Sequence, residues 1–168
     1  SIASPPYERG KMDLCIKKIE GGLVSPWFFT LKEGDTLDVS GPFGHFLVKD
    51  GHAVFAGTGT GIAPLRAMIK DLFKNGFKND CWLIFGNRYE TDVLYKEEFE
   101  GLSRLHPNFH FIPVISRPER WTGEKGYIQD IFSKYVDGPD NKKVYICGIV
   151  PMVVGLAESL TQKGWPKE

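Results

Sequence analysis

Cysteine is scarce in this sequence, and its scarcity excludes several kinds of protein. The 168 residues hold three cysteines, Cys15, Cys81 and Cys147, far apart and in no CxxC pair. Three thiols cannot supply an all-cysteine iron–sulfur cluster, and an odd, sparse count argues against a disulfide framework. The four histidines show no metal-ligand spacing. We therefore predict no metal site and a reducing compartment, the cytoplasm.

An excess of charge and a long apolar run are also missing. Lysine plus arginine and aspartate plus glutamate both total 21, so the formal net charge is +0. This balance indicates neither a nucleic-acid groove nor a polybasic membrane patch. No apolar run approaches the roughly 20 residues of a membrane span. What is present is 42% hydrophobic and 13% aromatic residues, enough for a buried core.

The pattern changes near residue 50. Before it, residues 11–19 and 36–40 alternate like strands, and residues 23–29 form a short helix in which Ser25 resembles an N-cap followed by a first-turn proline, Pro26. So few strands cannot close a barrel. Residues 1–48 therefore look like the C-terminal part of a larger antiparallel β-barrel.

Residues 49–168 alternate strands with amphipathic helices. The expected strands are 52–56, 81–85, 109–115 and 143–147, and Pro113 weakens the third or marks a bulge. Each precedes a segment with a helical apolar stripe, such as Ile62, Leu65 and Ile69. The prediction is an α/β fold, with a parallel sheet covered by helices on both faces. Ligands of such folds bind beyond the carboxyl ends of the strands.

The first strand runs into the turn Gly-Thr-Gly-Thr-Gly-Ile-Ala-Pro at residues 57–64. A glycine-rich turn that opens a helix brings backbone N–H groups close to a phosphate. The dehydrogenase GxGxxG pattern fails, because Ile62 stands where its third glycine should be, and no P-loop lysine follows. A tight strand–helix turn without a ligand is the less favoured alternative.

Candidate polar residues also follow the other strands. Arg88 follows the second strand, where it would suit a phosphate or an adenine, or else pair with Glu90 or Asp92. Ser116, Arg117, Lys125 and Tyr127 follow the third strand and could gather around a phosphate or form a solvated loop. Cys147 and Gly148 follow the fourth; a lone cysteine is more often a small buried hydrophobe.

Several motifs in order resemble the ferredoxin–NADP reductase superfamily of flavoprotein electron transferases. They are Ser-Ile-Ala-Ser at 1–4, Gly-Leu-Val-Ser at 22–25, Gly-Pro-Phe-Gly at 41–44, the 57–64 turn, Phe-Gly-Asn-Arg at 85–88, Asp-Val-Leu-Tyr at 92–95 and Tyr-Ile-Cys-Gly at 145–148. The likeness implies a flavin-binding part at 1–48 and an NAD(P)-binding domain at 49–168.

The resemblance also implies residue roles. Catalytic positions would be Ser1, near the flavin N5, and Cys147, beside the nicotinamide C4. The flavin pyrophosphate would lie at Gly22, Leu23, Val24 and Ser25, and that of NAD(P)H at Gly57, Thr58, Gly59, Thr60, Gly61, Ile62 and Ala63. Arg88, Ser116, Arg117, Lys125, Tyr127 and Gly148 would complete the coenzyme site. NADH and NADPH both remain open, as do FAD and FMN.

The function implied is hydride transfer from NAD(P)H to a flavin, which passes electrons to an iron–sulfur protein, an oxygenase or a haem protein. The chemistry belongs to the cofactors, so no acid–base dyad is expected. A non-catalytic dinucleotide-binding regulatory domain is the alternative; a plain Rossmann dehydrogenase fits less well. Because the family's Arg and Tyr before Ser1 and its last strand after Glu168 are missing, we expect part of a longer reductase that holds flavin poorly alone.

Overall fold

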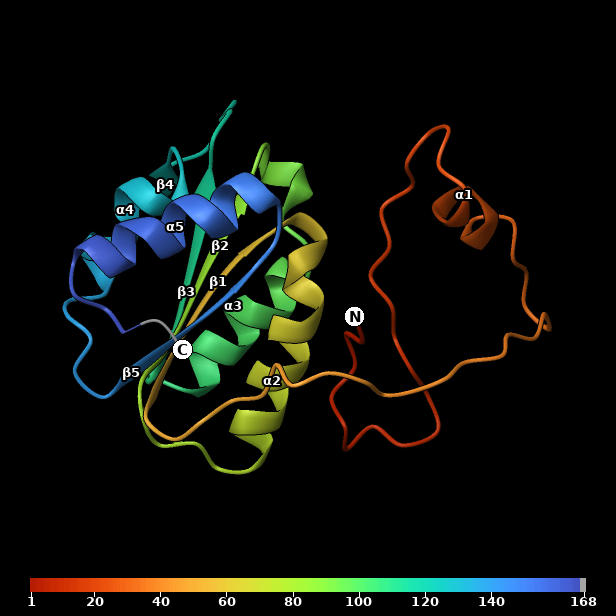
Figure 1. Cartoon of the computed structure of the whole chain (residues 1–168), viewed down its shortest axis with the longest axis horizontal. Coiled ribbons are helices and arrows are strands. Elements are labelled where there is room, and N and C mark those ends of the chain that lie inside the picture. Colours follow the sequence, from red (N-terminus) through yellow and green to blue (C-terminus); the bar gives the residue numbers. More distant parts are fainter. Residues whose placement is uncertain (167–168) are drawn as a thin grey trace.

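The computed structural model describes residues 1–166. Figure 1 shows two parts that follow the division seen in the sequence. Residues from about 50 onward form a layered α/β body, and the first 50 residues run beside it as an extended segment that carries one short helix, α1 (Val24–Phe28).

A five-stranded parallel sheet forms the centre of the body. Its strands are β1 (His52–Thr58), β2 (Cys81–Asn87), β3 (Phe109–Ile115), β4 (Glu124–Lys125) and β5 (Lys142–Cys147), in the order β4-β3-β2-β1-β5. β1 lies in the middle and pairs with both β2 and β5. Since all pairs are parallel, the carboxyl ends of the strands share one edge.

Helices cover both faces of the sheet, as predicted. α2 (Ile62–Lys74) and α3 (Lys96–Leu105) pack on the face that presents Phe55 and Phe85. α4 (Ile128–Tyr135) and α5 (Val150–Gln162) pack on the face that presents Val54 and Ile84. Successive strand residues point to opposite faces, so these near-continuous apolar strands supply two cores. Short 3₁₀ turns, η1 (Gly59–Gly61) and η2 (Glu90–Asp92), follow β1 and β2.

The third predicted strand is formed, and Pro113 lies inside it. Pro113 is in register with Phe85 of β2. On the other side of β3, β4 pairs only with Val114 and Ile115. Pro113 is thus at a point where β3 has a neighbour on one side only, which a residue without an N–H tolerates. The two-residue β4 was not predicted, because so short a strand has no periodicity to detect.

The N-terminal segment departs from the expected strands. Its helix was predicted, but Leu23 rather than Ser25 is the N-cap. Neither 11–19 nor 36–40 is a strand; the antiparallel pairing found in the described part of this segment is one bridge, Ile2 with Leu14. A strand needs a hydrogen-bonding neighbour, and residues 36–40 have none among residues 1–166.

Candidate functional site

The turns after β1 and β5 are in direct contact at the carboxyl edge of the sheet. Gly57 is in register with Cys147, and Thr58 with Gly86. A Cβ atom added to Gly61 would lie 2.3 Å from the carbonyl oxygen of Cys147, so only glycine permits this approach. Two stretches 90 residues apart in sequence therefore form one continuous backbone surface.

The Thr58 side chain links the two turns through a hydrogen bond. Its Oγ1 accepts a hydrogen bond from the backbone N–H of Ile149 at 3.1 Å. A Cβ on Gly148 would lie 2.1 Å from the same oxygen. The Thr58 hydroxyl is therefore occupied in holding the two turns together, and the surface they form is set by backbone packing.

The start of α2 is suited to an anion. No side chain caps it, and its first turn holds no acidic residue. Pro64 stands within that turn, where its missing N–H leaves no donor unsatisfied. Gly59 has a positive φ of 53° and open space where a Cβ would be. Uncapped N–H groups and the helix dipole together favour a phosphate at this point.

A second group of predicted residues gathers at the ends of β2 and β3. The backbone N–H of Ser116 donates to Asn87 O at 3.0 Å, and that of Arg117 donates to Arg88 O at 2.8 Å. Arg88 and Arg117 are both exposed. Glu90 accepts hydrogen bonds from the amides of Glu119 and Arg120, at 2.8 and 2.7 Å. That carboxylate therefore holds the following loop, rather than pairing with Arg88.

Lys125 and Tyr127 reach the same region through β4. Lys125 is in register with Ile115, the last residue of β3, and Gly126 donates its N–H to Ile115 O at 3.0 Å. Tyr127 is the N-cap residue of α4, and 66% of it is exposed. The sheet thus places an exposed hydroxyphenyl ring and three exposed cations (Arg88, Arg117 and Lys125) at the carboxyl ends of the neighbouring strands β2, β3 and β4.

Cys147 ends β5, on the other side of β1 from the cation group, and is half-buried. Burial raises the pKa of its thiol above the ordinary value. The group is therefore a neutral thiol near pH 7, suited to contact with a ligand and unsuited to nucleophilic attack.

The predicted flavin turn lies elsewhere. Gly22 donates its N–H to Ile19 O at 3.0 Å, and Ser25 Oγ accepts the Ile19 N–H at the same distance. Leu23 and Val24 are exposed, and no side chain caps α1. The backbone is open to an anion, but α1 stands apart from the sheet in Figure 1. The structure does not bring this turn to the strand ends.

One notable residue was missed in the sequence. Arg66 lies on the buried stripe of α2 and is only 6% exposed. Its place on the apolar stripe, four residues after Ile62, makes it unusual in the sequence but does not reveal its burial or its partners. Buried charges are rare unless they are paired.

An uncapped helix that follows a glycine turn, on the carboxyl edge of a parallel sheet, defines a dinucleotide-binding α/β domain. Comparison with known families identifies it further: the chain belongs to the oxidoreductase NAD-binding domain family, which matches residues 55–158. The oxidoreductase FAD-binding domain family matches residues 1–47. The predicted resemblance to the ferredoxin–NADP reductase superfamily is confirmed, and so are NAD(P)H and FAD as the cofactors of these two families.

Several known proteins are similar to this chain. The chain is 34% identical over 170 residues to the phenol hydroxylase P5 protein of Acinetobacter pittii, spanning 96% of this chain and 48% of that one. It is 34% identical to ferredoxin–NADP reductase B of Sorangium cellulosum, spanning 91% and 67%. A ferredoxin NADP⁺ reductase from Neisseria gonorrhoeae shares the fold, with a TM-score of 0.82 at 23% identity over 100% of this chain and 73% of that one.

The chain spans about half the length of the phenol hydroxylase component and of several other curated relatives. Across residues 1–166, no helix is long and apolar enough to cross a membrane.

Proposed function

We propose that this chain is the NAD(P)H-binding part of a flavoprotein reductase, which transfers hydride from NAD(P)H to FAD. The observation that carries the proposal is the contact between the 57–61 turn and Cys147–Gly148, next to an uncapped helix start. The match of residues 1–47 to an FAD-binding family supplies the acceptor. Hydride transfer is chemistry that the two cofactors provide; the protein binds them and excludes water.

In this proposal each predicted residue has a physical task. Residues 57–63 hold the coenzyme pyrophosphate on backbone N–H groups, and Cys147 with Gly148 lines the nicotinamide end. Arg88, Ser116, Arg117, Lys125 and Tyr127 hold the adenosine end. Ser1 contacts the flavin, and Gly22, Leu23, Val24 and Ser25 receive its pyrophosphate. The neutral thiol of Cys147 supports its contact role, because it adds no charge beside the nicotinamide.

Anaerobic titration of the flavin-loaded protein with NADH and with NADPH tests the function. Reduction bleaches the flavin absorbance near 450 nm in proportion to added coenzyme, with ~1 equivalent sufficing for a two-electron transfer. Coenzyme binding, followed by fluorescence, without bleaching would instead support the non-catalytic regulatory domain. If the protein shows neither coenzyme binding nor bleaching, both the reductase and the regulatory function are rejected.

The choice between NADH and NADPH rests on Arg117. A guanidinium binds a phosphate through two hydrogen bonds. If a 2′-phosphate lies there, Arg117→Ala weakens NADPH binding about tenfold or more and leaves NADH binding unchanged, as isothermal titration measures. Equal losses for the two coenzymes refute the pocket. Arg104→Ala, on the exposed last turn of α3, is the matched control.

The electron acceptor is proposed from the kind of relatives found. The phenol hydroxylase and ferredoxin–NADP reductase names point to an iron–sulfur protein, an oxygenase or a haem protein as the partner. The cytoplasm remains the proposed location, on the ground of three free cysteines in a described chain without a disulfide.

A further inference from the structure

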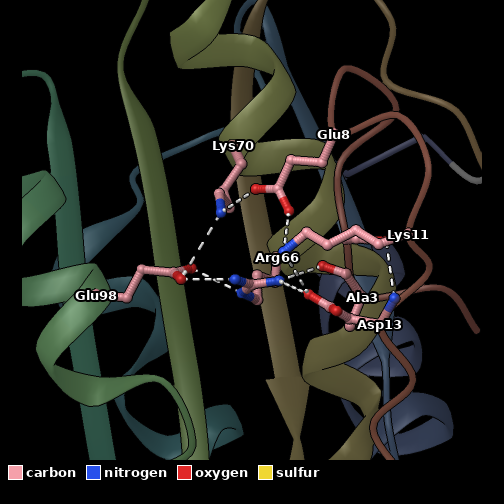
Figure 2. Close-up of polar contacts among 8 residues, drawn as sticks. Ala3, Glu8, Lys11, Asp13, Arg66, Lys70 and Glu98 are labelled. Carbon is pink, nitrogen blue, oxygen red and sulfur yellow. Dashed lines mark hydrogen bonds and ion pairs between the residues drawn. The ribbon is translucent and has the colours of Figure 1, made fainter.

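Arg66 is a buried cation, and each of its three guanidinium nitrogens donates a hydrogen bond. Its Nε donates to Glu98 Oε1 and its Nη2 to Glu98 Oε2, each at 2.7 Å, a two-pronged pairing that links α2 to α3. Figure 2 shows the guanidinium at the centre of a group of charged side chains. An unpaired buried charge is costly, so the partners packed around Arg66 are what allow a cation to be buried here.

The third guanidinium nitrogen, Nη1, reaches the N-terminal segment. Arg66 Nη1 donates to the backbone carbonyl of Ala3 at 2.7 Å, and Asp13 Oδ2 lies 3.7 Å from the same nitrogen. The Tyr95 ring lies against the guanidinium, 4.5 Å from its carbon to the ring centroid. One side chain therefore joins α2, α3 and the segment that matches the FAD-binding family.

Neighbouring ion pairs extend the same attachment (Figure 2). Lys70, one helical turn after Arg66, lies 2.8 Å from Glu8 Oε1 and 3.8 Å from Glu98 Oε2. Lys11 lies 2.8 Å from Glu8 Oε2. In addition, the Ala3 N–H donates to Asp13 O at 2.8 Å, and the Asp13 N–H donates to Ser4 Oγ at 3.0 Å. Residues 3–13 form a closed loop that Arg66 holds at both sides.

The same helix begins at the glycine turn. Arg66 comes four residues after Ile62, the first residue of α2, which is about 6 Å along the helix axis. A rigid helical turn thus separates the backbone proposed to hold the coenzyme pyrophosphate from the side chain that holds Ala3. Ser1, the residue proposed to contact the flavin, is two residues before Ala3.

We propose that Arg66 is a positioning residue for hydride transfer: through Glu98 and the Ala3 carbonyl, it fixes residues 1–4 of the flavin-binding region relative to the nicotinamide end of the coenzyme site. The inference rests on the proposed function. Hydride transfer requires the donor and acceptor atoms about 3–3.5 Å apart, and a displacement of 1 Å can cost about 100-fold in rate. A lysine cannot replace the arginine, because one ammonium cannot make the Glu98 fork and also reach Ala3.

The test compares Arg66→Lys with the exposed control Arg104→Lys in the flavin-loaded holoenzyme. For Arg66→Lys we expect anaerobic flavin reduction to slow by about 10- to 100-fold. The dissociation constant for NAD(P)H should change less than about twofold, because the glycine turn is untouched. Asp13→Asn, which weakens the 3.7 Å contact with Arg66 and the 3.8 Å contact with Lys11, should slow reduction by a smaller factor and serves if Arg66→Lys folds poorly.

A second measurement, hydrogen exchange, tests the same variants without flavin. Hydrogen exchange at the Ala3 and Asp13 amides should accelerate about tenfold or more in Arg66→Lys and not in Arg104→Lys. If Arg66→Lys speeds hydrogen exchange but leaves the rate of flavin reduction unchanged, the positioning role is overturned. Unchanged hydrogen exchange in Arg66→Lys also overturns it. If the unmutated protein itself is not reduced by NAD(P)H, the proposed function fails, and the inference that rests on it fails with it.

Discussion

Gly61 connects backbone packing with coenzyme binding at the scale of single residues. An added Cβ would lie 2.3 Å from Cys147 O and 2.7 Å from the Cα of Gly148, both backbone atoms that cannot rotate away. Gly61→Ala should therefore push the two turns apart and weaken NAD(P)H binding by about tenfold, or ~1.4 kcal/mol. Isothermal titration calorimetry measures the change.

Gly76→Ala is the control for Gly61→Ala. Gly76 has a positive φ of 77° with no atom within 4 Å of an added Cβ, so alanine costs about 1–2 kcal/mol of stability through backbone strain alone. If both variants bind the coenzyme equally well, the contact at Gly61 does not shape the site.

Glu8 gives a pH dependence with a defined sign. Hydrogen bonds from Lys11 and Lys70 hold its pKa at about 2, below the ordinary value of 4.5. A lowered folded-state pKa stabilises the fold above pH 4.5, and this contribution disappears as pH falls from 4.5 to 2. Denaturant midpoints of the unmutated protein should exceed those of Glu8→Gln at pH 6 and converge with them near pH 2. A constant difference across that range would contradict the assignment.

Arg66 shows why residue patterns in the sequence predict only part of the site. The glycine turn could be found because its chemistry is local: alternating glycines lead directly into a helix. Arg66 could not, because its role depends on Ala3 and Glu98, 63 and 32 residues away. A single arginine within an amphipathic helix normally belongs to the solvent face. Only the packing of three segments shows that this one is buried.

Among the elements, α3 carries a glycine whose replacement should stabilise the protein. Gly101 lies inside the helix, and the nearest atom to an added Cβ is Arg104 Nη2 at 3.7 Å, an ordinary contact. Glycine in a helix interior is less favourable than alanine by about 0.5–1 kcal/mol. Gly101→Ala should raise the free energy of unfolding by that amount in urea titrations.

The same substitution in α5 offers a matched comparison for α3. A Cβ at Gly155 would lie 3.3 Å from Gln129 Nε2, so the gain in helix propensity is opposed by crowding. A larger stabilisation from Gly155→Ala than from Gly101→Ala would mean that local space does not decide the outcome.

Strands of the α/β body were predictable, and those of the N-terminal segment were not. Residues 52–58 and 81–87 are apolar runs that find parallel partners on both sides, so hydrophobic pattern and pairing agree. Residues 36–40 have a strand-like alternation too, but Leu37 and Val39 are exposed and lie against no neighbouring strand among the described residues. Alternation indicates that a segment could be a strand; pairing depends on another segment.

For the whole molecule, the distribution of the core predicts which part is stable alone. In the described chain, every buried hydrophobic residue except Ala3 lies between Ala53 and Trp165. Contacts of the segment 1–48 with this body include the Arg66 cluster, the Lys74 ammonium over the Tyr7 ring, Cys15 and Val48 against the core, and Phe46 edge-on to the Tyr145 ring. Residues 49–168 should therefore fold as an independent domain, as expected from the sequence.

Removing residues 1–48 tests this directly. Arg66 would lose the Ala3 carbonyl but keep Glu98, and the loss of that charge-assisted hydrogen bond costs ~1.5–3 kcal/mol. Lys70 would also lose Glu8, and the Tyr145 ring would lose Phe46. We expect 49–168 to melt cooperatively, with unchanged far-ultraviolet helix signal and retained NAD(P)H binding, because the turns at 57–61 and 147–148 contact each other within this part. A gradual, non-cooperative melt would show instead that the N-terminal segment completes the fold, and that the two family-matched regions cannot be treated as separate units.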